Sequence, residues 1–204
     1  MSSKPRILIA TVDVLGWRTY ATRLREYAAQ REDFVPMFLS LRPSLVDRIC
    51  MSRVPFTSTK FVDPLNLFRW KVERWWRDEG RQLQVDAIHV ATQTCALGFS
   101  EIHPRKPFSI ALDVTRRLAT KEFSGQTFSA RSLGWEQSIF DRAYAIAAFS
   151  DWTTASLFDD YKISPDKIFR CLPSLVMPPL LNRRRSCLVA TPRFQIYFLL
   201  AMIT

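Results

Sequence analysis

Apolar runs about as long as β-strands alternate along this chain with stretches of helical periodicity. Continuous apolar, β-branched segments are typical of strands buried on both faces of a sheet. Six segments fit this pattern: RILIATV (6–12), DFVPMFLSL (33–41), VDAIHVATQ (85–93), PFSIALDV (107–114), YAIAAFS (144–150) and KIFRC (167–171). Pro36 has no amide N–H to donate, so the second segment is expected at a sheet edge or a bulge.

Helical patterns occupy the intervals between most of these strands. RTYATRLREYAAQ (18–30) and LGWEQSIFDRA (133–143) read as helices, and another follows Ser150. Asp63 is a good N-cap before Pro64, and predicts a long helix through about Leu83. Alternating strands and helices predict an α/β fold, a Rossmann-like doubly wound parallel sheet with the first strand central.

In such sheets, ligands bind outside the carboxyl ends of the strands. The polar and small residues that follow the apolar runs are therefore the first candidates for a functional site. They are Asp13 and Gly16, Thr92 and Gln93, Asp113 and Thr115, and Ser150.

Composition adds a basic charge to this picture. Of the 204 residues, 48% are apolar, which is enough to form a hydrophobic core. The net charge of +10 indicates an anionic partner, but it does not distinguish nucleic acid, phospholipid and phosphorylated substrates. Cys50, Cys95, Cys171 and Cys187 have no metal-ligand spacing and are expected to be reduced thiols. With only two histidines, a metal site is not expected.

Several kinds of chemistry have no motif in the sequence. The five glycines are not clustered, so neither a dinucleotide fingerprint nor a P-loop is present, and no nicotinamide, flavin or other cofactor is expected. A zinc-protease helix and a nucleophile elbow are missing as well. The start of the chain does not resemble a signal peptide, and no apolar run reaches the roughly 20 residues that span a bilayer.

The order of the remaining motifs resembles the N-terminal domain of retaining glycosyltransferases with the two-domain GT-B fold, of the family 4 type. Four stretches carry the resemblance from Arg6 to about Pro173. They are RILIATVDVLGWRTYATRLREYA, VDAIHVATQTCALGF, PFSIALDVT and, most specifically, WEQSIFDRAYAIAAFSDWTTASLFDDYKISPDKIFRCLPS.

The resemblance implies transfer of a sugar from a nucleotide-sugar donor to a glycan, lipid-linked or small-molecule acceptor, with retention of the anomeric configuration. It implies that Asp113 is the catalytic residue, orienting a hydroxyl group of the acceptor or sugar. Gly16, Trp17, Gln93, Thr115 and Ser150 are then expected to bind substrate, with Gly16 allowing close approach of the backbone. From the residues alone, Ser150 suits a helix cap and Glu136 suits a structural role.

The family pattern weakens after residue 175. We expect residues 1–175 to form the acceptor-side domain and residues 176–204 to be a linker and an aberrant or truncated start of a second domain. The nucleotide-binding domain of the family has no counterpart in the remaining sequence, so a truncated or frameshifted gene, a fragment or a short protein are all open. Most of the donor site would lie in that domain, and the isolated chain is expected to be inactive.

One helix adds a further partner. At 3.6 residues per turn, Leu65, Phe68, Val72, Trp75, Trp76 and Leu83 share one side of DPLNLFRWKVERWWRDEGRQL (63–83). Trp70, Arg74, Arg77 and Arg81 share the other side, which suits peripheral contact with anionic phospholipid as well as a plain solvated face. We therefore expect a cytoplasmic protein, with peripheral contact at the inner membrane face.

Two alternatives stay open beside the enzyme. The chain is suited to be a non-catalytic binding or scaffold module, or half of a two-chain enzyme. Nucleic-acid binding is not expected, because the basic residues are spread along the chain and no nucleic-acid motif is present.

Overall fold

The computed structural model describes residues 4–52, 62–123 and 125–171. Six parallel strands form its sheet, in the order β2-β1-β3-β4-β5-β6. The strands are β1 (Arg6–Val12), β2 (Val35–Leu41), β3 (Ala87–Ala91), β4 (Phe108–Leu112), β5 (Ala145–Ala148) and β6 (Ile168–Arg170). The expected linker, the domain boundary near 175, residues 176–204 and Cys187 lie outside the described residues.

Seven helices are described in the same ranges. They are α1 (Leu15–Ala29), α2 (Leu45–Cys50), α3 (Pro64–Asp78), α4 (Gln93–Ile102), α5 (Arg116–Glu122), α6 (Ala130–Arg142) and α7 (Asp151–Asp159). The parallel α/β sheet predicted from the alternating pattern is confirmed, and all the expected strands are present. Helices α2, α4 and α5 were not predicted.

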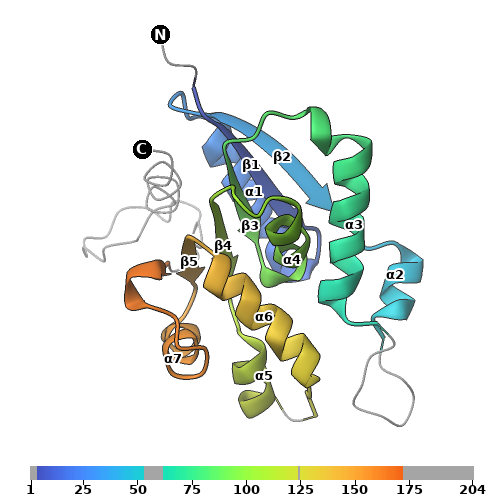
Figure 1. Cartoon of the computed structure of the whole chain (residues 1–204), viewed down its shortest axis with the longest axis vertical. Helices are drawn as coiled ribbons and strands as arrows, with labels where there is room; N and C mark the ends of the chain where they lie inside the picture. Colours follow the sequence, from blue (N-terminus) through green and yellow to red (C-terminus); the bar gives the residue numbers. More distant parts are fainter. Residues whose placement is uncertain (1–3, 53–61, 124, 172–204) are drawn as a thin grey trace, which may run out of the picture.

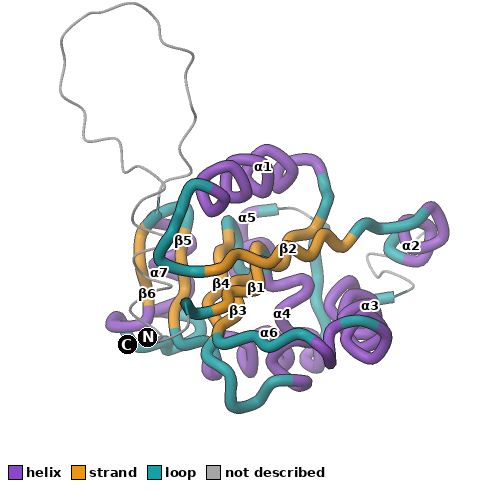
Figure 2. The backbone as a smooth tube through the Cα atoms, turned by 90° about the horizontal axis from the view of Figure 1, so that it is seen from above, coloured by secondary structure: helices purple, strands orange, loops and turns teal. Residues whose placement is uncertain are grey.

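The helices cover the two faces of the sheet unequally (Figures 1 and 2). Alternate residues of β1 show this, because Leu8, Ala10 and Val12 join a large core cluster with residues of α3, α4 and α6, whereas Ile7 and Ile9 pack against α1. Strands β3, β4 and β5 are buried at every position, as their continuous apolar sequences predict.

Strand β2 is an edge strand, as Pro36 indicated. Strand β1 was expected at the centre of the sheet, but it lies between β2 and β3, next to the edge strand. The helix that begins at the Asp63 N-cap ends at Asp78, short of Leu83, and a 3₁₀ turn follows (Gly80–Gln82). A Cβ at Gly80 would lie 2.3 Å from the Trp76 ring, so the backbone there packs directly against the indole.

Candidate functional site

The carboxyl ends of β1, β3, β4 and β5 lie at the same edge of the sheet, because the strands are parallel and neighbours in register. We call this edge the carboxyl rim. It carries Asp13 after β1, Thr92 after β3, Asp113 after β4 and Ser150 after β5. The strand order reverses between β1 and β3, which is where open α/β sheets bind ligands. The predicted candidates are therefore brought to one edge of one sheet.

Asp113 is exposed at the end of β4, but its carboxyl group is partly desolvated by the groups around it. That partial burial raises the pKa of Asp113 above its ordinary value, against the opposing effect of hydrogen bonds from backbone N–H groups. A carboxyl group with a raised pKa at this edge can accept a hydrogen bond from a hydroxyl group or exchange a proton with it.

The loop that carries Asp113 is fastened by side chains from other elements. The Thr153 hydroxyl of α7 donates a hydrogen bond to the carbonyl of Asp113. The Gln93 amide of α4 donates to the carbonyl of Val114 at 2.8 Å. Helices on both sides of β4 therefore hold the backbone next to the candidate carboxylate.

The same loop is held further along by Glu136, which lies in α6 and is fully buried. Its carboxylate accepts a hydrogen bond of 2.9 Å from the backbone N–H of Arg116, and others from the Tyr161 hydroxyl and the Gln93 amide. Burial raises the pKa of Glu136, while these donors act in the opposite direction. Glu136 thus has the structural role that its sequence position suggested.

Thr115 belongs to the interior of this loop. Its side chain accepts a hydrogen bond from the N–H of Leu118, capping α5, and pairs with the Ser156 hydroxyl at 2.6 Å. The residue is fully buried and helps to hold the loop, and its expected contact with a ligand stays a prediction. The Gln93 amide is also engaged, by Val114 and Glu136.

Ser150 caps α7, as its place after a buried strand predicted. Its Oγ accepts a hydrogen bond of 3.1 Å from the N–H of Thr153 and lies 2.9 Å from the Thr153 hydroxyl. Ser150 is half-buried and remains at the carboxyl rim. The cap therefore explains the serine by itself, and a ligand contact would come in addition to it.

Gly16 and Trp17 begin the helix that starts after β1. Gly16 is the second residue of α1. A Cβ at Gly16 would meet no atom within 4 Å, so the space beside it is open. Trp17 is half-buried, and its ring lies 5.4 Å from that of Phe149 and 5.5 Å from that of Tyr20.

Asp13 and Thr92, which the sequence placed among the candidates at the rim, each have a structural feature that the sequence did not show. Asp13 forms ion pairs of 2.7 Å with Arg18 and with Arg42, and its hydrogen bond with Arg18 lowers the pKa of Asp13. Thr92 has a φ of 92°, which is rare for a residue with a Cβ, and strain of this kind is enriched at functional sites. A backbone angle leaves no signal in a single sequence.

The remaining predictions about partners concern surfaces and ions. Among the described residues, no cluster of His, Cys, Asp and Glu is suited to a metal ion. In the same ranges, none of the helices has the length and apolar character needed to cross a bilayer. Trp70, Arg74, Arg77 and Arg81 are all exposed, whereas Leu65, Phe68 and Val72 on the opposite side of α3 are buried.

Comparisons with known proteins were made with the sequence and with the fold. No protein-family model and no curated protein matches the sequence. Among solved structures, the chain is similar to the crystal structure of UDP-N-acetylglucosamine 2-epimerase, with a TM-score of 0.51, 11% identity and coverage of 83% of this chain and 48% of that chain.

Two plant proteins give weaker matches at the same identity of 11%. Arabidopsis thaliana UGT89C1, complexed with UDP-L-rhamnose, matches with a TM-score of 0.48 over 98% of this chain and 55% of that chain. Phytolacca americana UGT2, complexed with UDP-2fluoro-glucose and pterostilbene, matches with a TM-score of 0.45 over 88% and 55%. The chain spans about half the length of each of these proteins. The likeness to the epimerase shows a shared α/β Rossmann-like fold.

Proposed function

We propose that the chain is the acceptor-side domain of a GT-B glycosyltransferase of the retaining, family 4 type, and that the carboxyl rim of its sheet takes part in sugar transfer. The observation that carries the proposal is the placement of Asp113 at the end of β4, on a loop held by Thr153 and Gln93. Support also comes from the parallel sheet and from the four sequence stretches that resemble that family.

In this proposal, Asp113 orients a hydroxyl group of the acceptor or of the transferred sugar. Retaining transfer develops positive charge on the sugar and negative charge on the leaving phosphate, and fixed dipoles stabilise both. The N-terminus of α1, where Gly16 leaves open space, is suited to an anionic group of the donor. Trp17 and Ser150 border the rim, while Gln93 and Thr115 keep the Asp113 loop in place.

The nucleotide would be held mostly by a second domain, because the described residues form a single sheet domain. The purified 204-residue chain is therefore expected to bind sugars or nucleotide-sugars weakly and to transfer none. If the chain is instead half of a two-chain enzyme, adding the partner chain would restore sugar transfer. A binding module would gain no activity from any partner.

A titration of the isotopically labelled chain tests the proposal. A panel of UDP-, ADP- and GDP-sugars, and separately of simple glycosides, is added while backbone amide signals are followed by NMR. We expect shifts at Gly16, Asp113 and Ser150, and weaker binding in Asp113→Asn than in the matched control Asp141→Asn on α6. Turnover of a nucleotide-sugar by the pure chain, or shifts confined to residues away from the rim, would contradict the proposal.

We also propose that the exposed stripe of Trp70, Arg74, Arg77 and Arg81 contacts the headgroups of an anionic membrane. An indole ring is stable at headgroup depth, and guanidinium groups pair with phosphate. Arg74 lies 3.7 Å from Asp78, so part of this charge is neutralised within the helix. Arg81 contributes from the 3₁₀ turn after α3.

A further inference from the structure

Helix α2 presents its aliphatic side chains to solvent. Leu45 is 74% exposed, Val46 is 66% exposed and Ile49 is 60% exposed, and none of the six residues of the helix is buried. An amphipathic helix usually turns its apolar side toward the core. Three large aliphatic side chains on one short helix therefore form an apolar surface that no described part of the chain covers.

Polar contacts hold α2 in this orientation. Ser44 accepts a hydrogen bond of 3.1 Å from the N–H of Asp47, and Asp47 accepts one of 2.6 Å from the N–H of Ser44, which is a complete capping box. Asp47 also forms an ion pair of 2.6 Å with Lys71 of α3, and Lys71 donates to the carbonyl of Arg42 at 3.3 Å. The helix is thus fixed at its start and from one side, which leaves its apolar residues outward.

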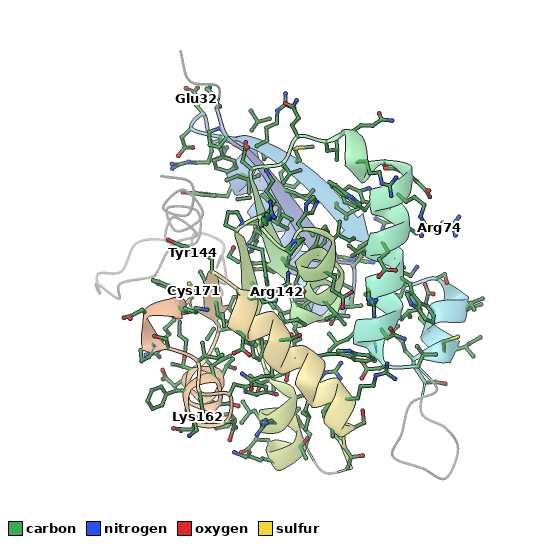
Figure 3. All side chains as sticks on the ribbon, in the orientation of Figure 1. Glu32, Arg74, Arg142, Tyr144, Lys162 and Cys171 are labelled. Atoms are coloured by element: carbon green, nitrogen blue, oxygen red, sulfur yellow. The ribbon has the colours of Figure 1, made fainter. Side chains whose placement is uncertain are left out.

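This apolar surface adjoins the exposed stripe of α3. The Lys71–Asp47 ion pair joins the two helices, and Figures 1 and 2 draw α2 beside α3. In Figure 3 the side chain of Arg74 extends outward on the side of α3 where α2 lies. Trp70, which is 55% exposed, is one turn away on the same helix face as Arg74. The helix with the exposed aliphatic groups thus adjoins the helix that carries the exposed indole and arginines.

We propose that α2 inserts Leu45, Val46 and Ile49 into the headgroup region of an anionic phospholipid surface. The charge around the patch favours this occupant, because Arg42 and Arg48 are exposed just before and in α2. Arg74 and Arg77 are exposed on the adjoining helix α3. Apolar side chains that enter the acyl boundary, with basic groups at phosphate level around them, are typical of interfacial helices. Long arginine side chains can reach the phosphates while the aliphatic residues are inserted.

A second copy of the chain is a poorer occupant. In a two-fold contact through α2, the same patch of each copy would face the other. Arg48 and Arg74 of one copy would then lie close to Arg48 and Arg74 of the second copy. Like charges brought together in this way oppose association. The inserted helix builds on the proposed contact through Trp70 and Arg74, but it is independent of sugar transfer.

Vesicle co-sedimentation of the full chain tests the inference, with no sugar donor or acceptor present. Vesicles of phosphatidylcholine, with and without phosphatidylserine, are compared at low and moderate salt. The test variant is the triple substitution Leu45→Gln, Val46→Gln, Ile49→Gln, which keeps good helix formers at solvent-exposed positions. The matched control is Trp152→Gln with Phe158→Gln, which removes exposed aromatic residues from α7 on the opposite side of the molecule (Figure 1).

We expect the wild-type chain and the α7 control to bind anionic vesicles equally and the α2 variant to bind about tenfold more weakly. An Arg74→Gln, Arg77→Gln variant should lose mainly the salt-sensitive part of binding. The inference is overturned if the wild type does not bind at low salt, if it binds neutral and anionic vesicles equally, or if the α2 variant binds like the wild type. A dimer in solution that the α2 substitutions abolish would also overturn it, in favour of a second copy. A chain that passes this test but shows no shifts at the carboxyl rim in the titration with nucleotide-sugars and glycosides would separate the two proposals.

Discussion

The backbone N–H of Arg116 donates a hydrogen bond of 2.9 Å to the carboxylate of Glu136, so a fully buried acid fixes the first residue of α5. Only three positions separate Arg116 from Asp113. Through this contact, and through Gln93, helix α6 controls the backbone on which the candidate catalytic carboxyl group stands.

Substitution of Glu136 should therefore destabilise the fold and disturb Asp113 together. Glu136→Ala leaves the Arg116 N–H and the Tyr161 hydroxyl without their buried acceptor, which should cost about 3 kcal/mol of unfolding free energy. Urea unfolding measures this cost, and an NMR titration of the Asp113 carboxyl group reports its pKa. If the alanine variant kept both the wild-type stability and the wild-type pKa of Asp113, Glu136 would have no positioning role.

The variant Glu136→Gln separates the shape of the side chain from its charge. Because burial raises the pKa of Glu136, the native state takes up a proton more readily than the unfolded chain does. The acid therefore stabilises the fold most below its ordinary pKa, and this stability is lost as the pH rises through the raised value. The glutamine side chain of Glu136→Gln cannot ionise. The loss of unfolding free energy in this variant, relative to the wild type, should therefore be greatest in acid and become smaller toward neutral pH.

The strands and the carboxyl rim could be predicted from the sequence because they depend on local patterns. Ala87 to Ala91 and Tyr144 to Phe149 are apolar at nearly every position, and the chain direction then places Asp113 and Ser150 at the same edge. The Ser150 and Asp63 caps were predictable for the same reason, since a cap depends on a few consecutive residues.

Contacts between residues far apart in sequence could not be predicted in this way. The burial of Thr115 depends on Ser156, which comes 41 positions later, and the helical place of Gly16 depends on how the chain leaves β1. Helix α2 was not predicted because its six residues are too few to show helical periodicity, and its apolar residues face solvent. The φ of Thr92 has no sequence signal.

Acid should weaken the fold through His89. This residue is buried in β3 between the Tyr20 hydroxyl at 3.2 Å and the Ser109 hydroxyl at 2.9 Å, and burial lowers the pKa of His89 from 6.5 to about 4. The unfolded chain binds the proton first as the pH falls, so His89 should remove about 2 kcal/mol of unfolding free energy between about pH 7 and pH 5.

Urea unfolding of His89→Gln at both pH values checks this expectation. The variant should lose much less stability on acidification than the wild type. The half-buried His103 serves as a matched control, because its pKa is lowered to a smaller extent. The variant His103→Gln should therefore still lose most of the unfolding free energy that the wild type loses on acidification. Equal acid sensitivity of His89→Gln and wild type would show that other groups carry the pH dependence.

The ion pair between Asp63 and Arg116 should be costly to break from one side. Both guanidinium NH groups of Arg116 donate to the Asp63 carboxylate, at 2.7 and 2.8 Å, and the Arg116 side chain is 8% exposed. Asp63→Ala would leave this cation nearly buried and α3 without its cap, and should lower the unfolding free energy by about 3 kcal/mol or more.

Arg116→Met in the Asp63→Ala background removes the unpaired charge and should recover part of that loss. The exposed pair Arg23–Glu26 on α1, at 2.7 Å, is the comparison, and Glu26→Ala should change the unfolding free energy by less than about 1 kcal/mol. A loss for Asp63→Ala no larger than that for Glu26→Ala would mean that solvent screens the buried pair.

Close packing of α3 on α4 depends on Gly98. A Cβ at this position would lie 2.7 Å from the Cβ of Val72 and 3.2 Å from the backbone Cα of Arg69, and neither atom is the end of a flexible side chain. Gly98→Ala must therefore push the two helices apart, which should cost about 2 kcal/mol of unfolding free energy despite the better helix propensity of alanine.

Gly134 in α6 provides the matched substitution, because a Cβ there would meet nothing within 4 Å. Gly134→Ala should raise the unfolding free energy by about 0.7 kcal/mol, since alanine loses less backbone entropy than glycine on entering a helix. Urea unfolding of the two variants thus gives opposite signs for the same chemical change. If Gly98→Ala were as stable as Gly134→Ala, the helices would have room to separate without loss, and the tight contact of α3 with α4 would not contribute to stability.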